Sequence, residues 1–239
     1  MFFVVPFLPI LAVYILAAVL PAVILLRYIY RHDTIEKEPA GLLLILLLMG
    51  VLSALLAGVL EGLAQSLLNL LVDPGSPTYT ILLAFLVVAA VEEGTKFWLL
   101  KRRTWNHWAF NYRFDGIVYA VFVSLGFAAF ENIQYVLHYG LSVALPRAFL
   151  AVPGHMSFAV YMGLYYGRAK LCDRCGDDIG ARRNLRAGYL SAVFFHGFYD
   201  TCAMIGTPLA TVIFAVFVAW MFWRVYSRVK RESISDTPV

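Results

Sequence analysis

The stretch AFLVVAAVEEGTKFWLL, residues 84–100, combines two features that rarely occur together. The apolar residues on both sides predict a membrane-spanning helix, because a run of about 20 apolar residues is long enough to cross a bilayer. The centre of the stretch, however, holds Glu92, Glu93 and Lys96. Charged side chains inside a membrane span are costly and commonly functional. The stretch therefore predicts a fold class and the position of a site at once.

The composition of the whole chain supports a membrane protein. Of the 239 residues, 62% are hydrophobic and 14% are charged, whereas soluble domains carry roughly 25% charged residues. Apolar runs predict seven spans, at 3–27, 41–71, 79–100, 115–137, 146–168, 187–205 and 208–226. We therefore expect an all-α fold, a polytopic transmembrane helix bundle. It forms a single domain over 1–239, with a short cytoplasmic tail at 227–239.

Basic residues are distributed unevenly over the connections between these spans. Seventeen of the nineteen Lys and Arg lie in four segments, at 27–37, 101–113, 168–186 and from 224 onward. The other connections contain Arg147 alone, and Lys96 lies inside a span. Because Lys and Arg are enriched on the cytoplasmic side, we expect an external N-terminus and a cytoplasmic C-terminus. This topology accounts for the basic clusters, so no nucleic acid is expected as a partner, only the lipid bilayer.

Eight ionisable residues lie inside the predicted spans: Glu61, Glu92, Glu93, Lys96, Glu131, His155, His196 and Asp200. One charge at the bilayer centre costs about 2.5–3.5 kcal/mol, so eight such groups facing lipid would cost roughly 20 kcal/mol or more. They must instead face the protein interior or a water-filled cavity. A rise of about 1.5 Å per residue puts Glu92, Glu131, His155 and His196 at comparable depths on four helices, which predicts one shared site. A lone intramembrane acid is often structural, so the place of Glu61 stays open.

The spacing of these residues allows three kinds of chemistry. Glu92 and Lys96 share a helix face, as do His196 and Asp200, because each pair is four residues apart. A buried carboxylate can serve as a general base on water, and a histidine oriented by a carboxylate can stabilise an oxyanion. Acids and histidines in spans also build proton or ion relays. A nitrogen and oxygen ligand set for zinc is present as well, although without an HExxH motif: Glu92, Glu131, His155 and His196.

Four motifs in order resemble those of the PrsW family of intramembrane proteases. EEGTK (92–96) fits the EExxK motif of that family, FAAFE (127–131) fits FxxxE, His155 in GHMSF fits the third motif, and HGFYD (196–200) fits HxxxD. The resemblance extends over about residues 30–205. The similar CAAX prenyl endopeptidases carry Arg, His and Asn where this chain has Lys96, Glu131 and Asp200. Prenylated peptides are therefore not the expected substrate.

The resemblance implies a membrane-embedded endopeptidase of the bacterial cell membrane, and it assigns roles to residues. Glu92 would be the general base on the catalytic water, and Glu131 or His155 would position that water or polarise the scissile carbonyl. His196 with Asp200 would support the oxyanion. The implied catalytic group is Glu92, Glu93, Glu131, His155, His196 and Asp200, with Lys96 and Phe127 in support.

The resemblance also bears on cofactor and substrate. It favours a metal-independent glutamate mechanism, so no cofactor is assigned, and a zinc site is the alternative. The implied substrate is a single-pass membrane protein such as an anti-sigma factor, cut as the first step of regulated proteolysis. The same residues also suit a proton- or ion-coupled transporter or channel, or a non-catalytic membrane scaffold. Cys172 and Cys175 form a CxxC pair that no second pair or nearby histidine completes, so no role is assigned to them.

Overall fold

The computed structural model describes residues 7–239, and the part it describes is helical with no strand. The all-α prediction is confirmed. A π-helical segment η1 (Leu83–Ala89) joins α3 to α4, and a short 3₁₀ segment η2 (Leu141–Val143) precedes α6. The α-helices are α1 (Phe7–His32), α2 (Ala40–Leu71), α3 (Pro77–Leu82), α4 (Ala90–Thr104), α5 (Asp115–Tyr139), α6 (Ala144–Phe149), α7 (Ala151–Arg174), α8 (Asp178–Ile205) and α9 (Pro208–Ile234).

Six of the seven predicted spans lie within one helical segment of the structure, apart from residues 3–6, which lie outside the described residues. The span predicted at 146–168 covers parts of α6 and α7 and the break between them at Leu150. Within the described part, five segments are long and apolar enough to cross a membrane. The other two, α3–η1–α4 and α8, carry charge: the first contains EEGTK, and the second begins with several arginines. Several helices also extend past the predicted ends of the spans. Helix α9, for example, continues to Ile234 through polar residues that follow the apolar run.

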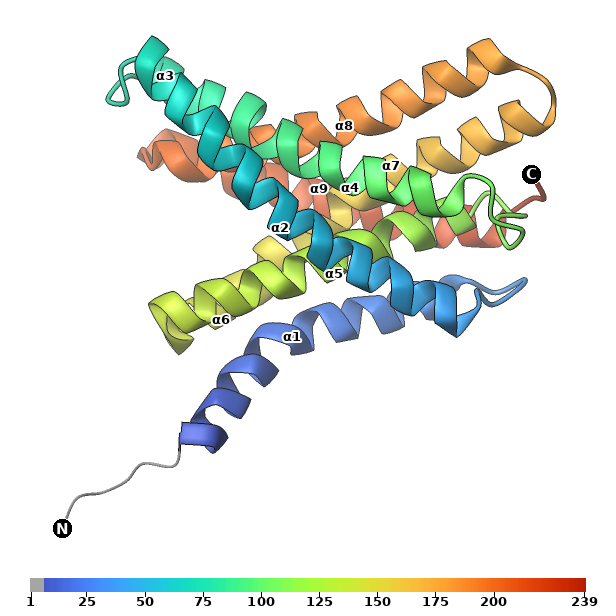
Figure 1. Ribbon diagram of the computed structural model, residues 1–239, viewed down its shortest axis with the longest axis horizontal. Helices are drawn as coiled ribbons and strands as arrows, with labels where there is room; N and C mark the ends of the chain where they lie inside the picture. The colour runs from blue at the N-terminus through green and yellow to red at the C-terminus, as the bar shows by residue number, and fades with distance from the viewer. Residues whose placement is uncertain (1–6) are drawn as a thin grey trace.

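The connections separate into two groups at opposite ends of the bundle. Figure 1 shows the connections 33–39, 105–114 and 175–177 at one end together with the C-terminus, and the connection 72–76 at the other. The first group carries the basic clusters of the sequence, so we call it the basic end. This arrangement is the alternation on which the predicted orientation rests.

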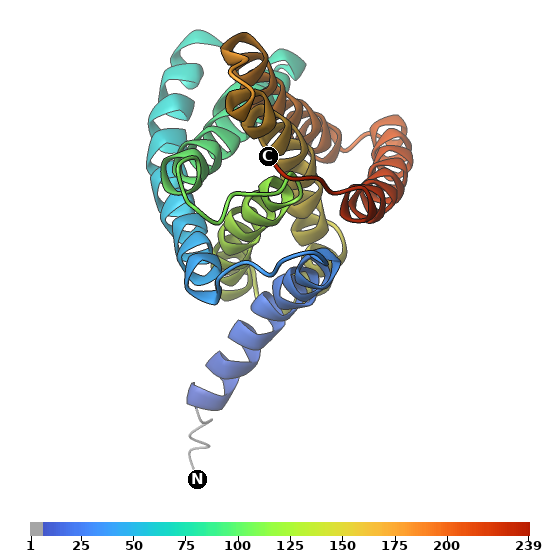
Figure 2. The same cartoon turned by 90° about the vertical axis from the view of Figure 1, so that its right-hand side faces the viewer.

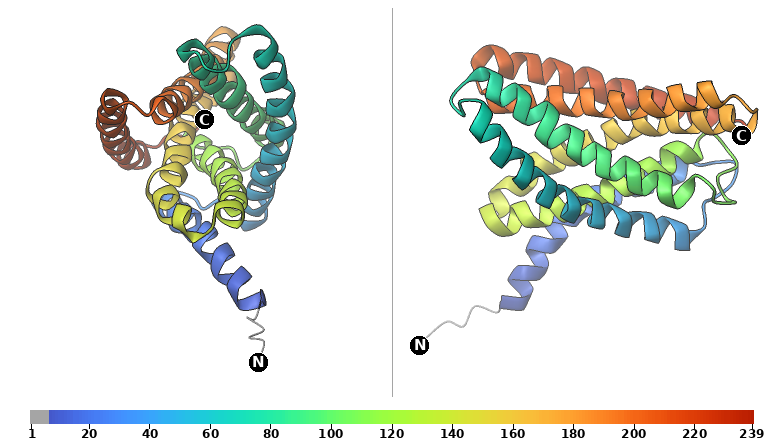
Figure 3. Two further views of the ribbon diagram at one scale, coloured as in Figure 1. Left: turned by 90° about the vertical axis from the view of Figure 1, so that its left-hand side faces the viewer. Right: turned by 45° about the horizontal axis from the view of Figure 1, so that its top comes forward.

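Helix α5 occupies the centre of the bundle. The end-on view in Figure 2 and the opposite one in Figure 3 both show the other helices around it, and most of its side chains are buried. Close packing requires glycine at the contacts. A Cβ on Gly126 would overlap the backbone of α2 at Leu47, and a Cβ on Gly116 would lie 2.6 Å from the backbone nitrogen of Gly167 on α7. The glycines therefore set how near α2 and α7 come to α5.

Two local irregularities shape the region where the polar residues meet. The π-helical segment η1 ends three residues before Glu92, and π segments within α-helices are frequent at functional sites. The α6–α7 break falls at Leu150. Pro153 explains the break, because its ring clashes with the carbonyl of residue 149 and it has no N–H to donate. The break leaves α6 free to take its own direction at the end of α5 that lies opposite the basic end.

Candidate active site

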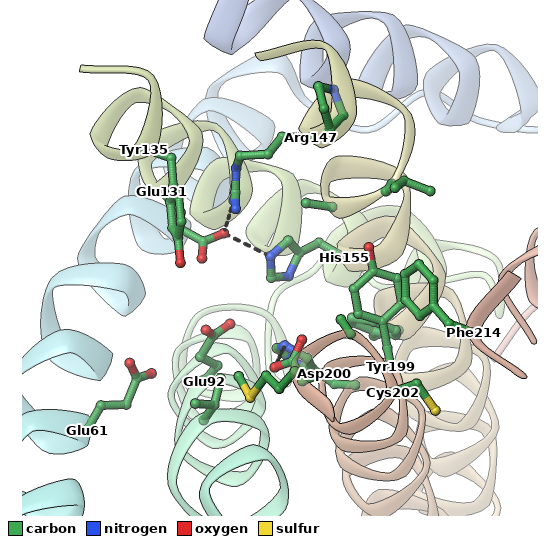
Figure 4. Close-up of a pocket in the computed structure, with 18 of the residues that line it drawn as sticks. Glu61, Glu92, Glu131, Tyr135, Arg147, His155, Tyr199, Asp200, Cys202 and Phe214 are labelled. Atoms are coloured by element: carbon green, nitrogen blue, oxygen red, sulfur yellow. Dashed lines mark hydrogen bonds and ion pairs between the residues drawn. The ribbon is translucent and has the colours of Figure 1, made fainter. Parts of the chain in front are cut away.

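A cavity of about 550 Å³ opens between α2, α4, α5, α7 and α8. Figure 4 shows the polar side chains pointing into it from these helices and from α6. Six of the eight ionisable residues predicted in the spans line the cavity, and Arg147 joins them. The polar lining is Glu61, Glu92, Glu131, Tyr135, Arg147, His155, His196, Tyr199 and Asp200.

Lys96 is at the centre of the polar cluster. Its Nζ lies 2.9 Å from Glu92 Oε2 and 2.8 Å from Glu93 Oε1. The same ammonium donates to Nδ1 of His155 at 3.3 Å and lies 3.8 Å from the centre of the Phe127 ring. With 2% of its surface exposed, Lys96 offsets the charge of both carboxylates inside the bundle. Phe127 adds a cation–π contact.

Glu92 and Glu93 have different surroundings although they are neighbours in sequence. Glu93 is fully buried (0% exposed) and its Oε1 accepts from both Lys96 and His196, while its Oε2 has no hydrogen-bond partner among the described residues. Glu92 is 5% exposed and lines the cavity. Only its Oε2 is bonded by a side chain of the described residues, so Oε1 is free for a water molecule. The structure thus separates a cavity-facing carboxylate from a buried one.

His196 is held between two carboxylates. Its Nδ1 lies 3.0 Å from Glu93 Oε1, and its Nε2 lies 3.3 Å from Asp200 Oδ2. The ring of Phe158 stacks on the imidazole at a centroid distance of 4.7 Å. The His196–Asp200 contact is the one expected from the four-residue spacing, whereas the Glu93 contact comes from another helix. The three partners together leave the imidazole little freedom to rotate.

His155 is oriented by a second carboxylate, which an arginine holds in turn. His155 Nε2 lies 3.1 Å from Glu131 Oε2, and Arg147 donates to that same oxygen at 2.7 Å. Arg147 also donates to the Asn132 side chain at 2.8 Å, and its guanidinium lies 3.8 Å from the centre of the Tyr135 ring. The motifs did not identify Arg147. The available signal was that it is the only basic residue in the connections opposite the basic end.

The residues present fit a divalent metal by their chemistry. One ligand atom from each of Glu92, Glu93, His155 and His196 lies within 4.8 Å of the others, and all four residues are buried. Two imidazoles and two carboxylates form a donor set that zinc accepts, and no residue in the described part of the chain bonds Glu93 Oε2. This group includes Glu93 and not Glu131, which bonds Nε2 of His155 instead, and the choice of metal ligands stays a prediction. Three of the four donors also contact the Lys96 ammonium.

The fold and the site together define a polytopic membrane protein with an acid–histidine cluster around a cavity inside the bundle, the arrangement of an intramembrane enzyme. Residues 38–225 match the sequence pattern of the PrsW family of intramembrane metalloproteases. The chain belongs to the PrsW family, and it is an intramembrane peptidase. Since its helices are long and apolar enough to span the membrane, it is a multi-pass integral protein of the bacterial plasma membrane.

Individual relatives cover nearly the whole chain. The Protease PrsW of Geobacillus kaustophilus (strain HTA426) is 34% identical over 215 residues, which are 90% of each chain. That of Halalkalibacterium halodurans is 29% identical over 92% of this chain and 97% of its own. That of Bacillus subtilis (strain 168) is 31% identical over 87% and 89%. No solved structure matches the chain.

Proposed function

We propose that this peptidase hydrolyses a membrane-anchored protein with a water molecule that Glu92 activates. One observation carries the proposal: Glu92 lines the cavity with Oε1 free, while its Oε2 is held by Lys96. A general base must reach the proton that it removes, and of the two adjacent glutamates only Glu92 lines the cavity. The ammonium fixes the carboxylate without blocking its second oxygen.

The surrounding groups suit the remaining parts of a hydrolysis. Glu92 takes a proton from water as the water oxygen attacks the scissile carbonyl carbon, and it later returns that proton to the leaving nitrogen. His155, oriented by Glu131, positions the water beside Glu92. His196 donates from Nε2 toward the oxyanion that forms on the carbonyl. This nitrogen suits the role because its contact with Asp200, at 3.3 Å, is the longer of the two that His196 makes.

A divalent metal bound by Glu92, Glu93, His155 and His196 would supply Lewis-acid activation of the water and the carbonyl. The ammonium of Lys96 contacts three of these four side chains. Metal and ammonium therefore compete for the same donors, and the chain's own contribution to the site is the rigid placement of those donors.

For the substrate we propose a single-pass membrane protein, and among such proteins an anti-sigma factor. The cavity lies within a bundle of membrane-spanning helices, so a substrate held in the same bilayer can reach it without leaving the membrane. The anti-sigma factor rests on the sequence resemblance alone. Cleavage of such a protein would begin regulated proteolysis.

A comparison of membrane proteomes tests this proposal. Cells that express the wild type, Glu92→Gln or His196→Asn are compared for new N-termini among single-pass proteins. Asp73→Asn serves as the matched control, because Asp73 lies exposed in the connection after α2. We expect cleavage products with the wild type and the control and none with the two site variants. Products that persist in Glu92→Gln would refute the role of Glu92.

A further inference from the structure

The cavity has more negative than positive groups. Five carboxylates belong to the cluster, and among the described residues two permanent cations, Lys96 and Arg147, lie beside them. Four of the five carboxylates contact one of these cations or a histidine. They are Glu92, Glu93, Glu131 and Asp200. The fifth is Glu61. With all five carboxyl groups ionised and His196 protonated, the cluster would carry an excess of negative charge, which is costly inside a membrane.

Glu61 is the carboxylate without a partner. It makes no ion pair or hydrogen bond through its side chain to the described residues, and its Oε1 is enclosed by protein. Its side chain extends from α2 toward the cavity, on the side of Glu92 (Figure 4). A carboxylate placed inside a bundle for structural reasons would have a hydrogen-bond donor beside it, because an unpaired buried charge is destabilising. None of the described residues supplies such a donor, so a group of a bound substrate can supply it.

The surroundings of Glu61 suit a long basic side chain. Val88 also lines the cavity and offers apolar contact. Lys and Arg place an aliphatic stem on apolar surface and carry the charge at its end. A charge-assisted contact to a carboxylate is also the strongest that an amino-acid side chain can make there. The metal-ligand group does not include Glu61, so a metal there would leave it unpaired.

We propose that Glu61 is a specificity-determining residue that binds a Lys or Arg side chain of the protein substrate near the scissile bond. This inference rests on the proposed function, since it names a feature of the substrate that the same cavity cleaves. The enzyme then selects among membrane segments by a basic residue at one position relative to the cut.

Cleavage of a peptide mixture tests the inference. The purified enzyme in proteoliposomes receives synthetic apolar peptides in which one position after another carries Lys, Arg, Gln, Met or Glu, and mass spectrometry identifies the products. At one position we expect kcat/KM to be about 10- to 100-fold higher for Lys and Arg than for Gln, the range of a charged hydrogen bond. Glu61→Gln should abolish this preference, and Glu61→Lys should shift it toward Glu. The control Asp73→Asn should keep the wild-type preference.

The outcomes separate this inference from the proposed function. Cleavage by the wild type without any basic preference overturns the inference alone, and that measurement needs no variant. A preference for Lys and Arg that survives in Glu61→Gln also overturns it. So does a Glu61→Gln variant that loses cleavage of all peptides to the same extent. If the wild type cleaves no more than Glu92→Gln does, the proposed function fails, and the inference fails with it.

Discussion

Replacing Lys96 by methionine keeps the length of the side chain and removes the ammonium that contacts Glu92 and Glu93. Removing one partner of a buried ion pair costs about 3–5 kcal/mol, because the other charge stays buried without compensation. Glu93 should account for most of this cost, since it is fully buried, whereas Glu92 borders the cavity and can be hydrated there. We therefore expect Lys96→Met to lower the free energy of unfolding by about that amount.

The assay is thermal unfolding in detergent, followed by the fluorescence of the five tryptophans. For a chain of this size 1 kcal/mol shifts the midpoint by about 2–4 °C, so Lys96→Met should lower it by roughly 6–20 °C. Lys101→Met is the matched control, because Lys101 lies on the same helix and is exposed. Its midpoint should stay within about 2 °C of wild type, since exposed charges contribute little to stability.

A second substitution distinguishes the two carboxylates. If Glu93 carries the cost, Lys96→Met combined with Glu93→Gln should recover more of the midpoint than Lys96→Met combined with Glu92→Gln. Two results would refute the reasoning. One is a Lys96→Met variant as stable as Lys101→Met, which would mean that the ammonium does not compensate the carboxylates. The other is a better rescue by Glu92→Gln.

Four further predictions follow from single contacts. Arg147→Gln should lower kcat about tenfold with little change in KM, because Glu131 then loses its 2.7 Å contact, and Arg147→Lys should recover part of the rate. Lys96→Met should raise the zinc bound per chain, measured by elemental analysis, because the donors no longer hold an ammonium. Burial raises the pKa of Glu38 from 4.5 to about 7, so folding binds a proton there. The resulting stability is complete below about pH 4.5 and is lost as the pH rises through about 7; Glu38→Gln should flatten that fall in unfolding temperature. Gly126→Leu should give no folded protein in size-exclusion chromatography, because its side chain would overlap the backbone of α2.

The sequence predicted the helices well, because the length of an apolar run is a direct physical requirement of the bilayer. The runs around 84–100 and 187–205 were recognised as spans although they include charges, and each lies within a helical segment of the structure. The ends were less accurate: the helices continue beyond the apolar runs where polar residues such as those after 226 remain helical. An apolar run marks where the bilayer lies, and a helix does not have to end there.

The meeting of residues at one site was also predictable, but their pairing was not. Depth along a helix follows from a count of residues, whereas the direction of a side chain depends on how the helix is rotated and tilted. The rotation of a helix about its axis is set by contacts such as that of Gly126 with α2. The sequence of one span does not reveal these contacts. Sequence reasoning therefore placed Glu131 among the candidate zinc ligands, whereas the described side chains close enough together to share an ion include Glu93 instead. Arg147 was missed because its position depends on the α6–α7 break at Leu150.

The adjacency of Glu92 and Glu93 now has a physical reason. Neighbouring residues on an α-helix point about 100° apart, so one can face the cavity while the other faces the bundle interior. Both still reach the one ammonium of Lys96, which lies three and four residues further on. Glu93 then orients His196 from behind, and Glu92 keeps an oxygen free in front. One acid contacts His196 and the other borders the cavity. A single acid at either position could therefore make only one of these two sets of contacts.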